Sequence, residues 1–320
     1  MHFRNGAVAI SYMSTLLMEY VDEHKISLTD KVGKWLPDLP DADQVTVKML
    51  ANMTSGYADY VTNPTLVTAT YPDPFRLWTG PELLALGISR PMSFAPGANW
   101  GYAHTNYVIL GQILEKVGHK PLATLLRQKV LTPLGLTNTV SSQTAAIPAP
   151  VLHAFTSERR EALGNPAGTP FCEESTYWNP SWALAPGAVE TTDIYDMTKT
   201  AVGIGGGALL SKSSYQAQTG PNLLGFGSSL PGCSCAKQVN GYNYGLGIVR
   251  SGQWLLQNPL FGGYGATEAY LPSKKVAIAV AVTLGPSSFD AEGNPSNYSD
   301  PIFRAIGAYL APGNAPPVKK

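Results

Sequence analysis

The chain changes character near residue 240, where helical spacing of apolar residues gives way to short strand-like runs. Apolar residues recur at helical spacing over residues 7–24, a stretch that contains no Gly or Pro. Residues 265–271 and 276–283 are strand-like, the second rich in Val, Ala and Ile, and residues 272–275 between them predict a hairpin turn. Helices followed by an antiparallel meander predict an α+β fold, in which an antiparallel sheet is flanked by helices.

The same spacing rules predict further elements along the chain. Helices are expected at residues 45–50, 81–88, 107–117, 122–130, 192–204, 211–218 and 302–310, and strands at 244–250 and 253–257. The Pro-rich stretch 63–75 and the polar stretch 141–186 are expected to be loops. We predict one domain over residues 1–320, with a helical region of about 35–200 between the first helix and a C-terminal sheet at 240–285.

Charge and composition exclude several classes of partner. The chain has 22 basic and 22 acidic residues, so it creates no field that would attract nucleic acid. No stretch approaches the roughly 18 apolar residues of a membrane span, and Met1 leads straight into the first helix with no secretory signal. We therefore expect no nucleic-acid partner and no membrane span.

The cysteines and acidic residues give no metal pattern. Cys233 and Cys235 lie in a Gly- and Pro-containing loop, and disulfides between such close neighbours are uncommon. We expect ordinary thiols, or one bridge from Cys172 to this loop. A group at His153, Glu158, Glu173 and Glu174 has no ligand spacing and is interpreted as a solvated loop. No metal and no cofactor are predicted.

Several segments, in order along the chain, resemble one enzyme superfamily. Residues 3–10, Phe-Arg-Asn-Gly-Ala-Val-Ala-Ile, are similar to its F-R-x-G-S-x-x-K segment. Other matching segments are Lys25–Asp30, Trp35–Pro37, Met53–Tyr57, Pro96–Tyr107 and Leu134–Thr139. The chain thus resembles the serine β-lactamase and penicillin-binding-protein superfamily, in the branch of class C β-lactamases, D-aminopeptidases and family VIII esterases. The resemblance implies a β-lactamase/transpeptidase-like fold.

The resemblance also implies where a site would lie, because three motifs of this superfamily meet in one cleft. Ala7 stands at the position of the nucleophilic Ser, and Ile10 at the position of the Lys. In the second motif, Y-x-N, Tyr102 is retained and His104 replaces Asn. The third motif, H- or K-x-G on an edge strand, is best matched by Phe261-Gly262-Gly263. An alanine methyl cannot attack a carbonyl, and an isoleucine cannot transfer a proton.

Further residues are expected around the ligand. Phe261, Gly263, Tyr264 and Trp178 are predicted to bind substrate. The aromatic residues Trp100, Phe171, Tyr177, Trp178 and Trp182 are either cleft-lining or packed within loops. If they line the cleft, the pocket favours an apolar or acyl-bearing ligand. The resemblance implies a small-molecule or peptide-like acyl ligand as the partner.

The resemblance implies further expectations about the N-terminus and the compartment. Members of the superfamily usually carry a helix and two strands before the first motif, and these strands are not found here. Their absence predicts an unpaired sheet edge and a partly open apolar face. The superfamily is mostly periplasmic or secreted, and the localisation of this chain is left open.

Three functions are compatible with these residues. The first is a β-lactamase-related protein that is catalytically impaired, because Ala7 and Ile10 replace the nucleophile and the Lys. The second is an active esterase or amidase of carboxylesterase, D-peptidase or β-lactamase type, which would use Tyr102, His104 or Ser11. Ser11 and Ser14 share a helix face with Ala7, and the alternative for them is a buried hydroxyl bonded to the preceding turn. The third is a partner-binding pseudoenzyme.

Overall fold

The main sheet is built from the C-terminal third of the chain. The computed structural model describes residues 1–142, 144–169 and 171–318. The sheet strands are β8 Asn243–Tyr244, β9 Val249–Ser251, β10 Trp254–Gln257, β11 Leu260–Phe261, β12 Tyr264–Leu271 and β13 Val276–Thr283. β12 pairs antiparallel with β13 along one edge and with β10 and β11 along the other, and β9 and β8 continue beyond β10. The predicted antiparallel sheet is confirmed.

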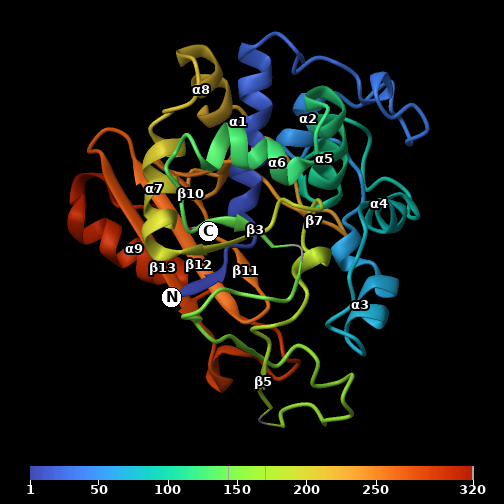
Figure 1. The fold of residues 1–320 in the computed structure, drawn as a ribbon, viewed down its shortest axis with the longest axis vertical. Helices are drawn as coiled ribbons and strands as arrows, with labels where there is room; N and C mark the ends of the chain where they lie inside the picture. The colour runs from blue at the N-terminus through green and yellow to red at the C-terminus, as the bar shows by residue number, and fades with distance from the viewer. Residues whose placement is uncertain (143, 170, 319–320) are drawn as a thin grey trace.

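Helices cover both faces of this sheet. The helices are α1 Val8–Asp22, α2 Val47–Ala51, α3 Pro64–Thr70, α4 Gly80–Ile88, α5 Thr105–Gly118, α6 Leu122–Leu126, α7 Ile194–Gly205, α8 Lys212–Thr219 and α9 Ser299–Leu310. Tyr270 of β12 packs against Gly205 of α7, whereas the hydroxyl of Thr267 hydrogen-bonds to that of Ser299 in α9 at 2.8 Å. Because residues of opposite parity point to opposite faces of a strand, α7 and α9 lie on opposite sides of β12 (Figure 1).

A second, smaller sheet fixes the start of α1. Its strands are β1 His2–Arg4, β6 Glu190–Asp193 and β3 Val140–Ser141, with β6 in the middle. The buried guanidinium of Arg4 donates hydrogen bonds to Thr191 Oγ1 at 2.9 Å and to two backbone carbonyls. The expectation that Met1 leads straight into a helix is therefore wrong, because backbone pairing with β6 orders the residues before α1 as a strand.

Other local differences from the predicted elements have local causes. Within the stretch 63–75, α3 forms because the side chain of Asn63 caps it and Pro64 occupies its first turn. Between 141 and 186 the structure contains the short strands β4 Phe155–Thr156 and β5 Glu173–Glu174. It also contains one turn of 3₁₀ helix, Pro180–Trp182. Most of that polar stretch has no regular secondary structure, as expected.

The cysteine prediction is wrong. Cys233 and Cys235 form a disulfide, and Cys172 is a free thiol. A turn before Cys233 leads into β7 Ser234–Cys235, which pairs with β2 Gly101–Tyr102. The two Cα atoms are 5.2 Å apart, within the range of roughly 4.4–6.8 Å that a disulfide requires.

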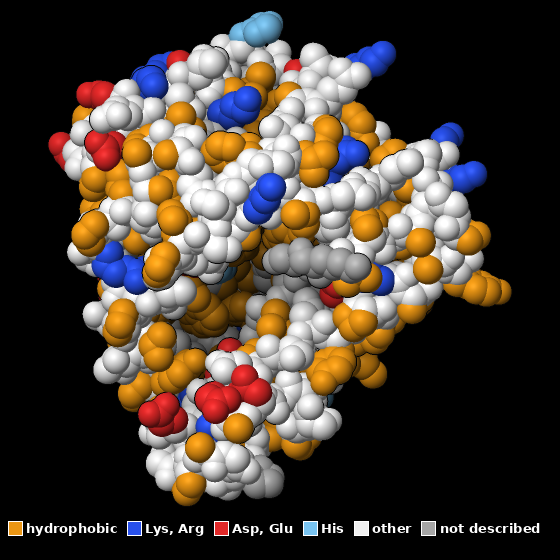
Figure 2. All heavy atoms as spheres, turned by 180° about the vertical axis from the view of Figure 1, so that it is seen from behind, with side chains coloured by type: hydrophobic (Ala, Val, Ile, Leu, Met, Phe, Trp, Pro, Cys, Tyr) orange, Lys and Arg blue, Asp and Glu red, His pale blue; other side chains and the backbone are white. Residues whose placement is uncertain are grey.

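One hydrophobic cluster joins the helical region to the sheet. It contains buried side chains from α1, α5, β10, β12 and α9, including Tyr12, Ile109, Trp254, Leu271 and Phe303. On the face shown in Figure 2 the surface is hollowed near its middle, and hydrophobic side chains are visible within the hollow. In the described part of the chain, no helix is both long enough and apolar enough to span a bilayer.

Candidate ligand-binding site

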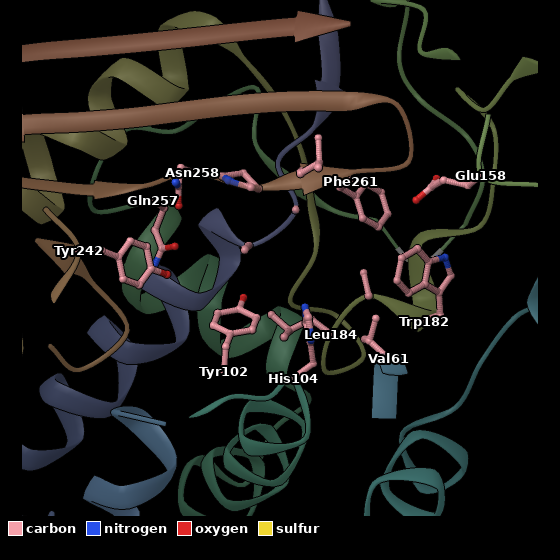
Figure 3. A pocket seen from close by; sticks show the side chains of 15 residues that line it. Val61, Tyr102, His104, Glu158, Trp182, Leu184, Tyr242, Gln257, Asn258 and Phe261 are labelled. Atoms are coloured by element: carbon pink, nitrogen blue, oxygen red, sulfur yellow. The ribbon is translucent and has the colours of Figure 1, made fainter. Parts of the chain in front are cut away.

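A cavity of about 370 Å³ opens where the start of α1, the ends of β10 and β11, and the helical region meet. Its size is that of a small-molecule site. The lining residues are Gly6, Ala7, Val61, Tyr102, His104, Glu158, Trp182, Ala183, Leu184, Tyr242, Gln257, Asn258, Pro259, Leu260 and Phe261 (Figure 3). Ala7, Tyr102, His104 and Phe261, four of the residues predicted for the site, thus share one pocket.

The backbone at Gly6, just before Ala7, passes very close to Pro259 and to Phe261 of β11. Gly6 adopts a φ of +51°, a left-handed conformation that glycine accepts without strain. A Cβ atom on Gly6 would lie 3.0 Å from the Cβ atom of Pro259 and 3.2 Å from that of Phe261. Only glycine fits between these side chains without displacing them. Ala7 follows as the N-cap of α1, and it lines the pocket.

The other α1 residues considered for catalysis do not line the pocket. The Ile10 side chain is fully buried in the main hydrophobic cluster. The Ser11 hydroxyl is also fully buried and donates to the Val8 carbonyl at 2.7 Å, while the Ser14 hydroxyl donates to the Leu246 carbonyl. Ser11 thus bonds to the preceding turn, as the alternative interpretation expected, whereas Ser14 is buried but bonds to a residue outside α1.

Tyr102 and His104 stand side by side at the junction of β2 and α5. Their rings meet edge to face with centroids 5.0 Å apart, and burial raises the pKa of Tyr102 well above its ordinary value. His104 Nδ1 lies 3.1 Å from Asp59 Oδ2, and Asp59 Oδ1 accepts the His104 backbone N–H at 3.1 Å. Asp59 thereby fixes the imidazole ring. Sequence reasoning missed this carboxylate, because residues 59 and 104 are adjacent only after folding.

The strand side of the pocket differs from the expected third motif. Phe261 lines the pocket, but the polar side chains there are Gln257, the last residue of β10, and Asn258. Gln257 donates a hydrogen bond from Nε2 to the Gly247 carbonyl at 2.6 Å. Phe261 itself offers no polar group, so the polar side chains on this wall are those of Gln257 and Asn258. Gln257 matches no motif in the sequence, and its place at the end of the predicted strand 253–257 does not by itself indicate a role.

Three predicted substrate-binding residues lie outside the lining. The chain reverses at Gly262-Gly263, and Gly263 packs against the backbone of Phe155. Tyr264 donates its hydroxyl to the Leu152 carbonyl at 2.6 Å, on the side of the sheet that packs with Phe3. Trp178 is 8% exposed and lies beneath the Arg159 guanidinium, so its packing is within the loops.

The end of the pocket away from Tyr242 combines aromatic rings with a carboxylate. The Trp182 and Phe261 rings stack with centroids 5.4 Å apart and an interplanar angle of 28°. Glu158, from the loop that follows β4, lines the same end and accepts a hydrogen bond from Thr156 Oγ1 at 2.9 Å. Burial raises the pKa of Glu158. Among the described residues, no three His, Cys, Asp or Glu side chains are grouped to hold a metal ion.

A pocket between an antiparallel sheet and a helical region, with a helix beginning at its wall, defines a β-lactamase/transpeptidase-like protein. A family model described as Beta-lactamase matches residues 1–299. The chain belongs to the β-lactamase family, and the resemblance found in the sequence is confirmed.

Curated relatives match shorter stretches of the chain. It is 30% identical over 112 residues to Penicillin-binding protein 4* of Bacillus subtilis (strain 168), covering 34% of this chain and 24% of that protein. It is 23% identical over 129 residues to a putative D-alanyl-D-alanine carboxypeptidase of Escherichia coli (strain K12), covering 39% and 30%. The matched stretches therefore span about a quarter to a third of these relatives.

Solved structures match the fold over most of the chain. A D-stereospecific amidohydrolase from Streptomyces sp. aligns with a TM-score of 0.76 and 23% identity over 88% of this chain and 82% of that one. The D-amino acid amidase from Ochrobactrum anthropi SV3, complexed with L-phenylalanine amide, aligns with a TM-score of 0.75 and 22% identity over 98% and 85%. At these identities the likeness establishes the shared fold.

Proposed function

We propose that the pocket binds a small acyl- or amide-containing ligand, which can be peptide-like, reversibly and without forming an acyl-enzyme. One observation carries the proposal: among the described residues that line the pocket, none is Ser, Thr, Cys or Lys. Acyl transfer of the family type needs a hydroxyl nucleophile with a base beside it. Here the residue that begins α1 at the pocket wall, the N-cap Ala7, offers only a methyl group.

The remaining groups of the pocket favour binding. Tyr102, His104, Gln257 and Asn258 supply hydrogen-bonding groups, and Val61, Leu184 and the stacked aromatic pair supply apolar contact area. A few convergent polar groups on a mainly apolar wall are typical of sites that orient a small ligand. The family includes proteins named for amidase and carboxypeptidase activities, so amide-containing ligands are the first class to screen.

Intrinsic tryptophan fluorescence tests the proposal, because Trp182 lines the pocket. Titration with a panel of amides, esters and short peptides should give a saturable signal that dialysis reverses. In a Trp182→Phe variant the fluorescence signal should largely disappear. Trp35 is half-buried and lies outside the lining, so Trp35→Phe is the matched control, and it should keep the signal. A panel without any saturable binder would contradict the proposal.

Hydrolysis by direct attack of water is a second candidate, favoured by the His104–Asp59 contact. An imidazole held by a carboxylate is the usual arrangement of a general base. Nitrophenyl esters would then be turned over without a burst, and His104→Gln would abolish the turnover. Equal turnover by the wild-type and His104→Gln proteins would remove this candidate.

A further inference from the structure

The described lining of the pocket is acidic rather than basic. Glu158 is the only Asp or Glu among the lining residues that the structure describes, and no Lys or Arg is among them. The basic neighbour Arg159 is engaged elsewhere, since its Nη1 atom lies 3.1 Å from an oxygen of Glu173. Among the ion pairs formed by described residues, none includes Glu158. The pocket therefore carries an uncompensated acid.

Aromatic rings accompany this carboxylate. In Figure 3, Glu158, Trp182 and Phe261 lie toward one end of the pocket, and Tyr102, Tyr242 and Gln257 toward the other. A carboxylate beside aromatic side chains suits an ammonium group, because the carboxylate pairs with the charge and the ring π-systems attract cations. Burial without a paired cation is costly for a carboxylate, and a bound ammonium would offset that cost.

We propose that Glu158, Trp182 and Phe261 form a subsite for the ammonium group of the ligand, so that the pocket selects primary amines that carry an apolar group over carboxylates. This inference rests on the proposed binding function. It names the ligand class for the same site. A ligand carboxylate at this end would meet Glu158 as a like charge, with no lysine or arginine of the described lining to offset the repulsion.

Calorimetry with three matched probes tests the subsite at neutral pH. Phenylalanine amide is cationic, N-acetylphenylalanine amide is neutral, and N-acetylphenylalanine is anionic. The cation should bind at least about tenfold more tightly than the neutral probe, as expected for a charge-assisted hydrogen bond, and the anion should bind most weakly. Glu158→Gln should bring the cation to within about threefold of the neutral probe and leave the neutral probe within about twofold of its wild-type affinity.

The control variant is Glu161→Gln, because Glu161 is exposed in the same loop and outside the lining. It should keep the wild-type preference, and circular dichroism should show both variants folded. Equal binding of the cationic and neutral probes by the wild type, or an unchanged preference in Glu158→Gln, would overturn the subsite and leave the binding function standing. Absence of binding by all three probes would overturn the subsite as well, and the tryptophan titration with the wider panel would then decide the binding function separately.

Discussion

At the scale of single residues, Ala7 and His104 place an apolar group and a polar group on the same pocket wall. Ala7 lines the pocket, while Ile10, one turn further along α1, lies in the main hydrophobic cluster. His104 has a carboxylate partner, Asp59. The pocket thus contains polar groups that can orient a ligand.

Asp59 is expected to be a positioning residue for the pocket. Its carboxylate accepts the backbone N–H groups of His104 and Val61 as well as contacting the His104 ring. Replacing Asp59 by Ala leaves these donors without a partner and should lower the free energy of unfolding by about 1–3 kcal/mol, measured by urea denaturation. The exposed Asp38 gives a matched control, and Asp38→Ala should stay within about 0.5 kcal/mol of wild type. An Asp59→Ala protein as stable as this control would contradict the assignment.

At the scale of elements, the structure buries an acidic residue on a strand of each of the two sheets described above. Glu190 lies on β6 with neither carboxylate oxygen hydrogen-bonded among the described residues, and Glu268 lies on β12. Burial raises the pKa of Glu268 from 4.5 to about 8 and the pKa of Glu190 well above its ordinary value. Each group is therefore easier to protonate in the folded chain than in the unfolded one.

This predicts a stability that falls as the pH rises. Because both folded pKa values are raised, the contribution of these groups is fully present below about pH 4.5 and is lost as the pH rises through about 8 for Glu268. Thermal unfolding followed between pH 5 and 8 should show a declining Tm, and Glu268→Gln should flatten the decline. The exposed Glu292 gives the control Glu292→Gln, which should leave the slope unchanged. A Tm that rises over this range in the wild type would contradict the raised pKa values of these two groups.

The elements also show which parts of the fold a sequence can predict. The α1 helix and the β12–β13 hairpin follow from periodicity alone, because each is long and keeps one pattern. β1 has only three residues and owes its conformation to pairing with β6, almost 190 positions away, so no local pattern marks it. In the site, Ala7 and Tyr102 could be predicted from motif order. Gln257 and Glu158 could not, because their roles depend on where the chain ends a strand or closes a loop.

At the scale of the whole molecule, the outer edge of the main sheet is open in the described part of the chain. β13 pairs with β12 over eight residues and has no partner strand on its other side. The flanking helices expose large apolar side chains, including Tyr195 on α7 and Ile302 and Tyr309 on α9. A long uncharged edge strand beside apolar surface promotes pairing with other chains.

We therefore expect concentration-dependent association of this chain, measured by size-exclusion chromatography with light scattering. A lysine on the half-exposed position Ala277 of β13 should reduce it, since a charge on an edge strand opposes pairing. Lysine at the exposed position Ser273, in the turn before β13, is the control and should leave the association unchanged. A monomer at all concentrations would show that this edge needs no partner.

The central claim is that a β-lactamase-family pocket with Ala7 at its wall holds a ligand without becoming acylated. Intact-protein mass spectrometry after prolonged incubation of the chain with benzylpenicillin measures this most directly, because one acylation event adds the mass of one inhibitor molecule. We predict an unchanged protein mass. A stoichiometric adduct that maps to a residue of the pocket would contradict the account.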